Sequence, residues 1–279
     1  MQKLIELGSD MAALWGEYWK SYLNGIANTL ILALVATVIG CLIGFVCGIL
    51  QTIPHSKSDP PVKRFFLALI RVIVRVYVEV FRGTPMILQA VFVYYALPYF
   101  TNNQVRFSNV WLAAIVVVSI NTGAYMAESV RGGILSIDPG QTEGAKAIGM
   151  NHFQTMRYVI LPQALRNIMP QIGNNFIINI KDTSVLSVIS ITDLFFVHKS
   201  VVGAQYTYFE SATIVMLIYL TMTLVSSYLL RLWEKKLDGP QNYDLDTTDT
   251  LAYTSGMYNA PDPDHKSQNL DMKEGASHV

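Results

Sequence analysis

Long apolar runs with few charges dominate the sequence. A helix needs about 20 mainly apolar residues to cross the hydrocarbon core of a bilayer. Runs of roughly that length lie at residues 26–50, 76–98, 110–128, 168–189 and 209–233. The pattern therefore predicts an all-α membrane protein with five transmembrane helices.

Basic residues are distributed unevenly between the segments that join these runs. Twelve lysines and arginines follow the first, third and fifth runs or lie at their ends, and only four lie on the opposite side. Short basic loops stay in the cytoplasm. The asymmetry predicts an N-terminus outside and a C-terminus inside, which agrees with an odd number of spans.

The two ends of the chain differ from the apolar part between them. Residues 1–24 have no basic start of a cleavable signal, so we expect them to be a retained extracytoplasmic segment. Residues 25–237 form the predicted transmembrane domain. Residues 238–279 contain eight acids and two lysines and few large apolar side chains. This composition predicts a disordered cytoplasmic tail, either a regulatory segment or, as we prefer, a spacer.

Composition supports a membrane protein and excludes several other classes. The sequence is 52% hydrophobic and 14% charged, with a mean hydropathy of +0.34, whereas soluble domains are about 25% charged. Cys41 and Cys47 lie in an apolar run and suggest neither a disulfide nor a metal site. The five histidines lack metal-ligand spacing, and no hydrolase or phosphate-loop motif occurs. We therefore expect no metal, no cofactor bound by this chain and no enzymatic activity.

The first run has small residues at four-residue spacing: Ala36, Gly40, Gly44 and Gly48. Such a stripe makes a flat face that another helix backbone can approach closely. The partner helix could belong to a second subunit or to the same bundle. From the sequence alone we prefer the second alternative.

The segment 138–166 has the start and stop signals of two short helices, although it lies between membrane spans. Asp138 can cap a helix that begins at Pro139, and Gly149 can end it. Asn151 and Gln154 have the spacing of a capping box for a second helix. We expect Pro162 to disrupt or end that second helix.

Between these signals, small residues alternate with apolar ones. Gly144, Ala145, Ala147 and Gly149 permit close approach, while Ile148 and Met150 offer apolar surface to a partner. The segment is either a docking surface or a loop that folds back on its own bundle. The residues themselves leave these two alternatives open.

The same segment resembles the EAA loop of ABC importer permeases. The matching residues are Glu143-Gly144-Ala145, then Gly149, then Val159-Ile160-Leu161-Pro162. The spacing agrees throughout, and the sequence departs from the family pattern only at Gly144 and Val159. Gly144 should cost about 1 kcal/mol of helix stability relative to alanine.

Further motifs are similar to those of the polar amino acid branch of that family, in the same order along the chain. They are Phe81-Arg82-Gly83-Thr84-Pro85, Glu128-Ser129-Val130-Arg131-Gly132-Gly133-Ile134, Leu161-Pro162-Gln163-Ala164-Leu165-Arg166 and Lys181-Asp182-Thr183-Ser184. The resemblance covers nearly everything from residue 24 to residue 237. It implies the type I ABC importer permease fold in a bacterial cytoplasmic membrane.

The resemblance also implies partners. These are a second permease subunit, identical or homologous, two ATPase subunits that bind ATP and Mg²⁺, an extracytoplasmic substrate-binding protein, a polar amino acid and the lipid bilayer, with no nucleic acid. The coupling loop would use Glu143, Gly144, Ala145, Ala147, Ile148, Gly149, Met150, Leu161 and Pro162. A related amino-acid-like solute is the alternative substrate, and a passive channel is the alternative function.

Polar residues within the predicted spans form two stripes. The third span has Asn121, Thr122, Tyr125 and Glu128, and the fourth has Asn175, Asn179 and Asp182. A path lined by amides, hydroxyls and acids suits an amino acid, so the stripes are candidate pathway residues. They could instead hold neighbouring helices together by hydrogen bonds. We prefer the pathway for Asn121 and Glu128 and leave both alternatives open for the others.

The second span contains a predicted break. Arg82 lies three residues after Glu79, and Gly83 and Pro85 should kink or unwind the helix. We expect Glu79 and Arg82 to form a structural ion pair at this kink. Contact of Arg82 with a substrate carboxylate is the alternative.

Overall fold

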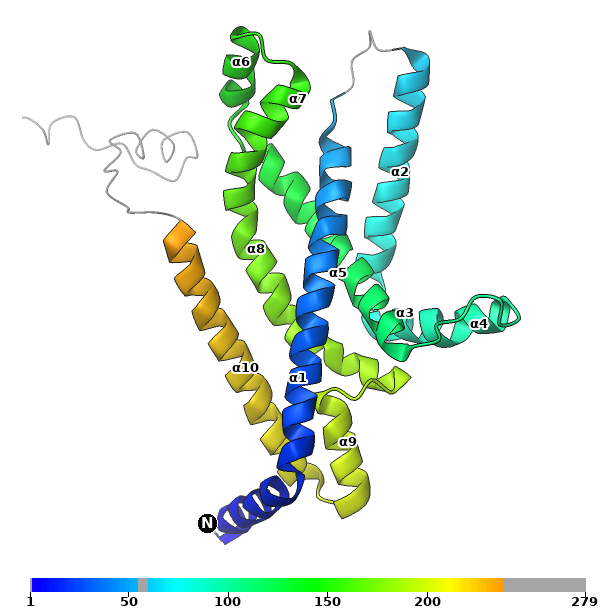
Figure 1. Ribbon diagram of the computed structural model, residues 1–279, viewed down its shortest axis with the longest axis vertical. Helices are drawn as coiled ribbons and strands as arrows, with labels where there is room; N and C mark the ends of the chain where they lie inside the picture. Colours follow the sequence, from blue (N-terminus) through cyan, green and yellow to red (C-terminus); the bar gives the residue numbers. More distant parts are fainter. Residues whose placement is uncertain (1, 55–59, 238–279) are drawn as a thin grey trace, which may run out of the picture. The chain divides into compact units, whose positions relative to one another are not determined.

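The computed structural model describes residues 2–54 and 60–237. The predicted tail, 238–279, lies outside the described residues. Within them all regular secondary structure is helical and there is no strand, as predicted (Figure 1).

The first helix, α1, spans Gln2–Thr52 and is much longer than the predicted run 26–50. The helix extends through the segment that we assigned to the extracytoplasmic side. Figure 1 shows the N-terminal part of α1 turning away from the axis of the rest. The polar residues before the apolar run therefore continue the helix and do not end it.

The stripe of small residues on α1 packs against α5, which spans Val110–Leu135. A Cβ built on Gly40 would lie 3.0 Å from the carbonyl oxygen of Ser119, and one on Gly48 would lie 2.9 Å from that of Ala127. These contacts leave no room for a side chain. The stripe thus serves packing within one chain, as we preferred.

The second predicted span, 76–98, is not one helix. Helix α2 spans Pro61–Gly83, and a new helical segment follows as α3 (Met86–Val91), η1 (Phe92–Ala96, a π-helix) and α4 (Leu97–Phe100). Thr84 and Pro85 are extended between them. Pro85 has no N–H and disfavours a helical conformation in the residue before it, so the predicted break is confirmed and is complete.

The segment after α5 forms α6 (Pro139–Ala147) and α7 (His152–Thr155). Of the two effects expected of Pro162, the structure has the disruption and not the end of the second helix. Helix α7 continues through η2 (Met156–Ile160, a π-helix) into α8 (Leu161–Asp182). The N–H of Leu161 donates to the carbonyl of Met156, five residues back. This wider turn just before the proline accommodates its missing N–H and its ring.

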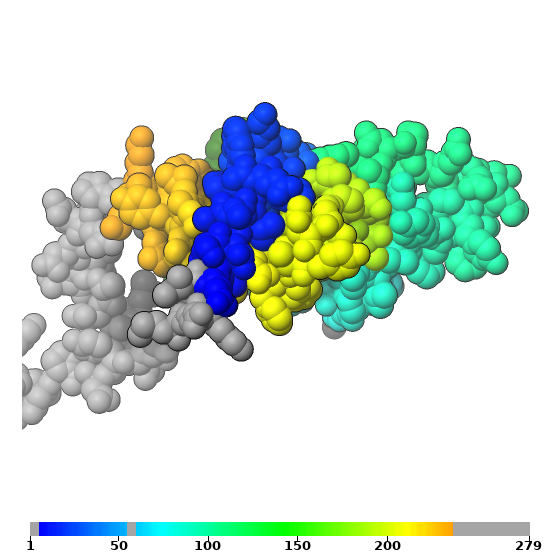
Figure 2. Space-filling view, turned by 90° about the horizontal axis from the view of Figure 1, so that it is seen from below, coloured from blue at the N-terminus to red at the C-terminus, as the bar shows by residue number. Residues whose placement is uncertain are grey.

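The last part of the chain includes a helix that the sequence did not predict. A 3₁₀ segment, η3 (Thr183–Ile189), follows α8, and then come α9 (Leu194–Gln205) and α10 (Tyr208–Leu237). The carboxylate of Asp193 caps α9 by accepting the N–H of Phe196 at 2.9 Å. Figure 2, a view from below Figure 1, shows α9 (yellow) against α1 (blue).

Apolar packing joins these helices in four clusters along α1. One lies between α1, α8, α9 and α10, a second between α1, α3, α5 and η3, a third between α1, α5, η2 and α8, and a smaller fourth between α1, α2 and α5. Helix α1 thus contributes to each of them. This packing places α5 and α8 side by side, so that the polar stripes of the two helices lie close together.

Three described helices are long and apolar enough to cross a membrane: α1 within Glu6–Thr52, α5 within Val110–Leu135 and α10 within Tyr208–Lys236. A fourth span results if His152–Ile189 and Leu194–Gln205, which are bent by 50°, are taken together. Helix α2 contains six charged residues between Lys63 and Arg82. Length and composition therefore leave the five-span count a prediction.

Candidate functional site

A cavity of about 440 Å³ lies between the α2–α3 break, α5 and α8. Six of the seven polar residues predicted from the two stripes line it: Asn121, Thr122, Tyr125, Asn175, Asn179 and Asp182. Arg82, Gly83 and Pro85 from the predicted break line it as well. The fold thus brings together residues that are about 100 positions apart in the sequence.

The wall at the α2–α3 break is held by two amides. Gln89 Nε2 donates to the carbonyls of Phe81 at 2.9 Å and Thr84 at 3.0 Å. Asn121 Nδ2 donates to the same Phe81 carbonyl at 3.0 Å and to Gln89 Oε1 at 3.1 Å. These bonds satisfy carbonyls that the broken helix can no longer pair with its own N–H groups.

Gln89 is not among the site residues predicted from the sequence. The sequence does contain a feature that could have identified it, since Gln89 is an amide within an apolar run, four residues after Pro85. The side chain is 8% exposed. Such a buried glutamine after a proline-induced break is expected to bond the freed backbone.

The deepest polar residues of the cavity join three helices. Asn179 Nδ2 donates to Thr37 Oγ1 of α1 at 2.7 Å and to Thr122 Oγ1 of α5 at 3.0 Å. Asn175 Nδ2 donates to the carbonyl of Gln171 at 2.9 Å and to Met126 Sδ of α5 at 3.2 Å. Both asparagines are buried. For Asn121, Thr122, Asn175 and Asn179, the hydrogen-bond alternative is therefore realised in this structure, although all four also line the cavity.

The more accessible part of the cavity wall has aromatic and charged side chains. Tyr125 is 42% exposed, and the guanidinium carbon of Arg82 lies 5.3 Å from the centre of its ring. Asp182 is exposed at the C-terminal end of α8. A cation and an anion thus line the same cavity together with neutral donors and acceptors.

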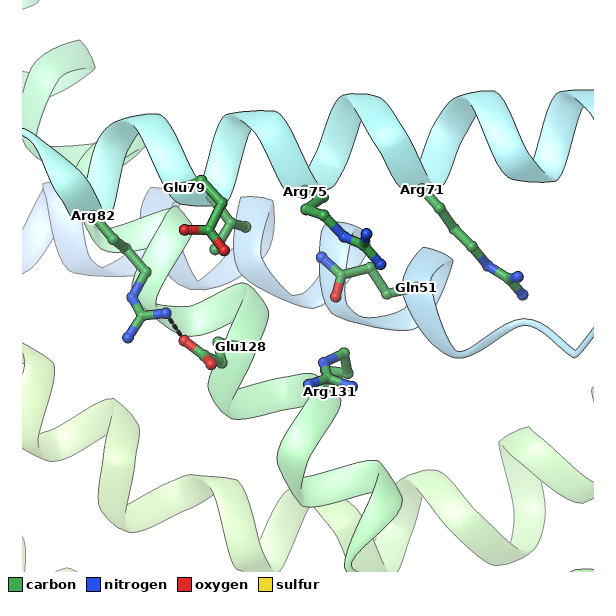
Figure 3. Close-up of a pocket in the computed structure, with 8 residues that line it drawn as sticks. Gln51, Arg71, Arg75, Glu79, Arg82, Glu128 and Arg131 are labelled. Carbon is green, nitrogen blue, oxygen red and sulfur yellow. Dashed lines mark ion pairs between the residues drawn. The ribbon is translucent and has the colours of Figure 1, made fainter.

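Glu128, the seventh predicted residue, lines a different cavity of about 230 Å³. Its carboxylate forms an ion pair with Arg82, which lines both cavities. The predicted pair of Glu79 with Arg82 is therefore wrong. Figure 3 shows the Arg82 side chain reaching from α2 across to Glu128 on α5, so the pair joins two helices and not two turns of one.

The α6–α7 segment has the predicted caps. Asp138 Oδ1 accepts the N–H of Gly140 at 2.6 Å, and Asn151 and Gln154 form a reciprocal capping box at 2.9 Å each way. Gly149 has φ +83°, a left-handed conformation that glycine adopts without strain. These features fix a short, well-defined helical hairpin.

The surface of this hairpin differs in part from our expectation. Glu143, Gly144 and Ala147 are exposed, and Ile148 is 75% exposed, but Ala145 is buried and Met150 is partly buried. A Cβ built on Gly144 would meet nothing within 4 Å.

Two exposed aromatic residues of the same segment were not predicted. Phe153 is 73% exposed and Tyr158 is 65% exposed. Ile148, Phe153 and Tyr158 are thus three large apolar side chains that the described residues leave exposed. Of the two alternatives for this segment, the uncovered surface favours docking.

The described residues contain no group of three or more His, Cys, Asp or Glu side chains placed to hold a metal ion.

Comparisons with known proteins agree on one family. Residues 62–239 match the family described as binding-protein-dependent transport system inner membrane component. The chain is 42% identical over 162 residues to the glutamine transport system permease protein of Escherichia coli (strain K12), covering 58% of this chain and 73% of that one. It is 38% identical over 161 residues to the arginine transport system permease protein of Bacillus subtilis (strain 168), covering 58% and 72%.

Solved structures give the same result. A crystal structure of an amino acid ABC transporter with histidines matches with a TM-score of 0.69 and 35% identity, over 79% of this chain and 95% of that one. An inward-facing MetNI methionine ABC transporter matches with a TM-score of 0.63 over 78% and 96%. Its identity of 19% makes it evidence for the fold alone.

Proposed function

Because the chain belongs to the binding-protein-dependent transport system inner membrane component family, we propose that it forms the translocation pathway for a polar amino acid in an ABC importer. The chain is a multi-pass permease of the bacterial cytoplasmic membrane and not itself an enzyme. Its relatives named for glutamine and arginine transport support an amino acid as the substrate.

The observation behind this proposal is the cavity that six of the seven stripe residues and the α2–α3 break line together. An amino acid presents a carboxylate and an ammonium group. The guanidinium of Arg82 has N–H groups beyond the nitrogen paired with Glu128 that can donate to the carboxylate, and Asp182 can accept from the ammonium. The amides and hydroxyls between them suit a polar side chain. We assign this cavity to the substrate.

The proposed topology has five membrane spans, with the N-terminus outside and the C-terminus inside. Helix α2 with the α3–α4 segment forms the second span, broken at Thr84 and Pro85. A broken helix is tolerated within a membrane where its free backbone groups are satisfied, and Gln89 and Asn121 satisfy them here. This arrangement puts the α6–α7 hairpin in the cytoplasm.

The α6–α7 hairpin is the proposed docking surface for an ATPase subunit, which binds ATP and Mg²⁺. Glu143, Ile148 and Phe153 are exposed on it, so a partner can cover apolar surface and pair with one carboxylate. A second permease subunit and an extracytoplasmic binding protein complete the proposed importer.

Charge reversal on the docking surface tests this function. We expect Glu143→Lys to abolish ATP-driven uptake of labelled glutamine or arginine by membranes containing the complete importer, because the reversed charge lies on an exposed position of the proposed docking surface. Asp10→Lys, a reversal at an exposed position of α1, is the matched control and should leave uptake unchanged.

Stability separates the two alternatives for the hairpin. The Glu143→Lys protein should accumulate in the membrane and unfold at the same temperature as the wild type. Normal uptake by this variant would contradict the docking role, and a loss of folding would show that the hairpin belongs to the packed bundle.

A further inference from the structure

The smaller cavity between α1, α2 and α5 is rich in arginine. Arg71, Arg75 and Arg82 approach it from α2, Arg131 from α5, and Gln51 lies beside them on α1 (Figure 3). These residues are drawn together by the crossing of three helices and do not form a run in the sequence.

The lining residues leave an excess of positive charge. Four arginines face two glutamates, Glu79 and Glu128, so the lining has a formal charge of +2. Arg82 is already paired with Glu128. Arg71 Nη2 donates to the carbonyl of Ile53 at 2.5 Å, which fixes this guanidinium at the end of α1. Arg75 and Arg131 remain as exposed guanidinium groups from two different helices.

The same helix has an exposed apolar face next to these arginines. On α2, Val72, Ile73, Val76 and Val80 are each roughly half exposed. At 100° per residue, these positions occupy the sector adjacent to that of Arg71, Arg75 and Arg82. A charged cavity therefore borders an apolar strip along one helix.

We propose that this cavity binds the phosphate of an anionic phospholipid between Arg75 and Arg131, with the acyl chains lying along the apolar strip of α2. Guanidinium groups are suited to phosphate because they donate in pairs. A soluble anion would use the arginines but would leave the apolar strip uncovered, whereas a phospholipid uses both. Basic pockets between membrane helices on the cytoplasmic side are suited to such headgroups. The proposal rests on the topology proposed above and is independent of which solute the chain transports.

Direct lipid binding tests the proposal. The full chain in detergent micelles is titrated with phosphatidylglycerol, and with phosphatidylcholine of the same acyl chains, while native mass spectrometry records the bound lipid. We expect tighter binding of phosphatidylglycerol. Each arginine near an anionic surface contributes about fivefold, so the double substitution Arg75→Gln with Arg131→Gln should weaken it by about 25-fold.

Three further variants make the result specific. Arg231→Gln removes an exposed arginine of α10 outside the cavity and should leave the affinity for phosphatidylglycerol unchanged. Glu79→Gln removes the lining carboxylate that is not paired with Arg82 and should tighten binding. If the double glutamine variant does not fold, Arg75→Lys with Arg131→Lys retains the charge and should retain most of the preference for phosphatidylglycerol.

Several outcomes would overturn the proposal. If the double variant and Arg231→Gln lost affinity for phosphatidylglycerol equally, binding would depend only on the net charge of the protein. Displacement of the lipid by millimolar inorganic phosphate would identify a soluble anion as the ligand, and displacement by millimolar glutamine would assign the cavity to the transported solute. Efficient cross-linking between two copies of Val76→Cys would show that a second copy covers the apolar strip.

Discussion

Glycine at three positions of α1 allows two membrane helices to approach almost to backbone contact. At Gly44, a Cβ would lie 2.9 Å from the backbone nitrogen of Ala127 and would also collide with the Met126 side chain. Backbone cannot move aside as a flexible side chain can. The close packing of α1 on α5 therefore depends on the absence of a single methyl group.

We predict that Gly44→Ala lowers the free energy of unfolding by about 1–3 kcal/mol, the usual cost of overpacking. Gly132→Ala is the matched control, because a Cβ at this α5 glycine meets nothing within 4 Å and alanine favours helix. Thermal unfolding of both variants in detergent checks the prediction. It would be wrong if the two variants unfolded at the same temperature.

At the same scale, the sequence identified polar residues but not their partners. The periodicity of Asn121, Tyr125 and Glu128 on one helix was sufficient to assign a common face. Only the three-dimensional arrangement shows that Asn121 pairs with Gln89 and that Glu128 pairs with Arg82. Spacing along a helix constrains direction, but the partner depends on which neighbouring helix is opposite.

At the scale of single elements, the break between α2 and α3 is the feature that shapes the cavity. Thr84 and Pro85 interrupt the helix, and Gln89 returns from the following turn to bond the carbonyls of Phe81 and Thr84. The break is therefore a supported structure and not a frayed end.

Gln89→Leu should destabilise the protein by about 1–3 kcal/mol, because this buried amide loses its hydrogen bonds to the carbonyls of Phe81 and Thr84 and to Asn121 Nδ2. Gln104→Leu removes an exposed amide from the loop before α5 and is the control. The measurement is again thermal unfolding, accompanied by uptake. A Gln89→Leu protein as stable as the control would show that water or another group satisfies the break.

Element boundaries were predictable where a local signal decides them. The caps at Asp138 and Asn151 and the turn at Gly149 were correctly predicted, because capping depends on residues within one turn. The continuation of the helix past Pro162 and the presence of α9 were not predicted. The continuation depends on a π-turn just before the proline, and α9 is a short helix without a long apolar run. Length-based rules for membrane spans overlook both.

At the scale of the whole molecule, family membership and helical class followed from motif order and hydropathy, whereas the cavity did not. Its walls come from α2, α3, α5 and α8, and no local pattern specifies how these helices cross. The stripes on α5 and α8 predicted two polar faces. Packing around α1 determined that these faces meet.

Our central claim is that this cavity contains the transported amino acid, and substrate protection at Ile178 tests it most directly. Ile178 lines the cavity without a polar role, so Ile178→Cys, with Cys41 and Cys47 replaced by alanine, provides a thiol probe inside it. Gln104→Cys, at an exposed position of the loop before α5, is the control.

The measurement is the rate at which a small polar thiol reagent labels each cysteine in the energised importer, with and without glutamine or arginine. We predict that one of these amino acids slows labelling of Ile178→Cys several-fold and leaves the labelling rate of Gln104→Cys unchanged. Labelling of Ile178→Cys at the same rate with and without an amino acid that the variant still transports would contradict the claim.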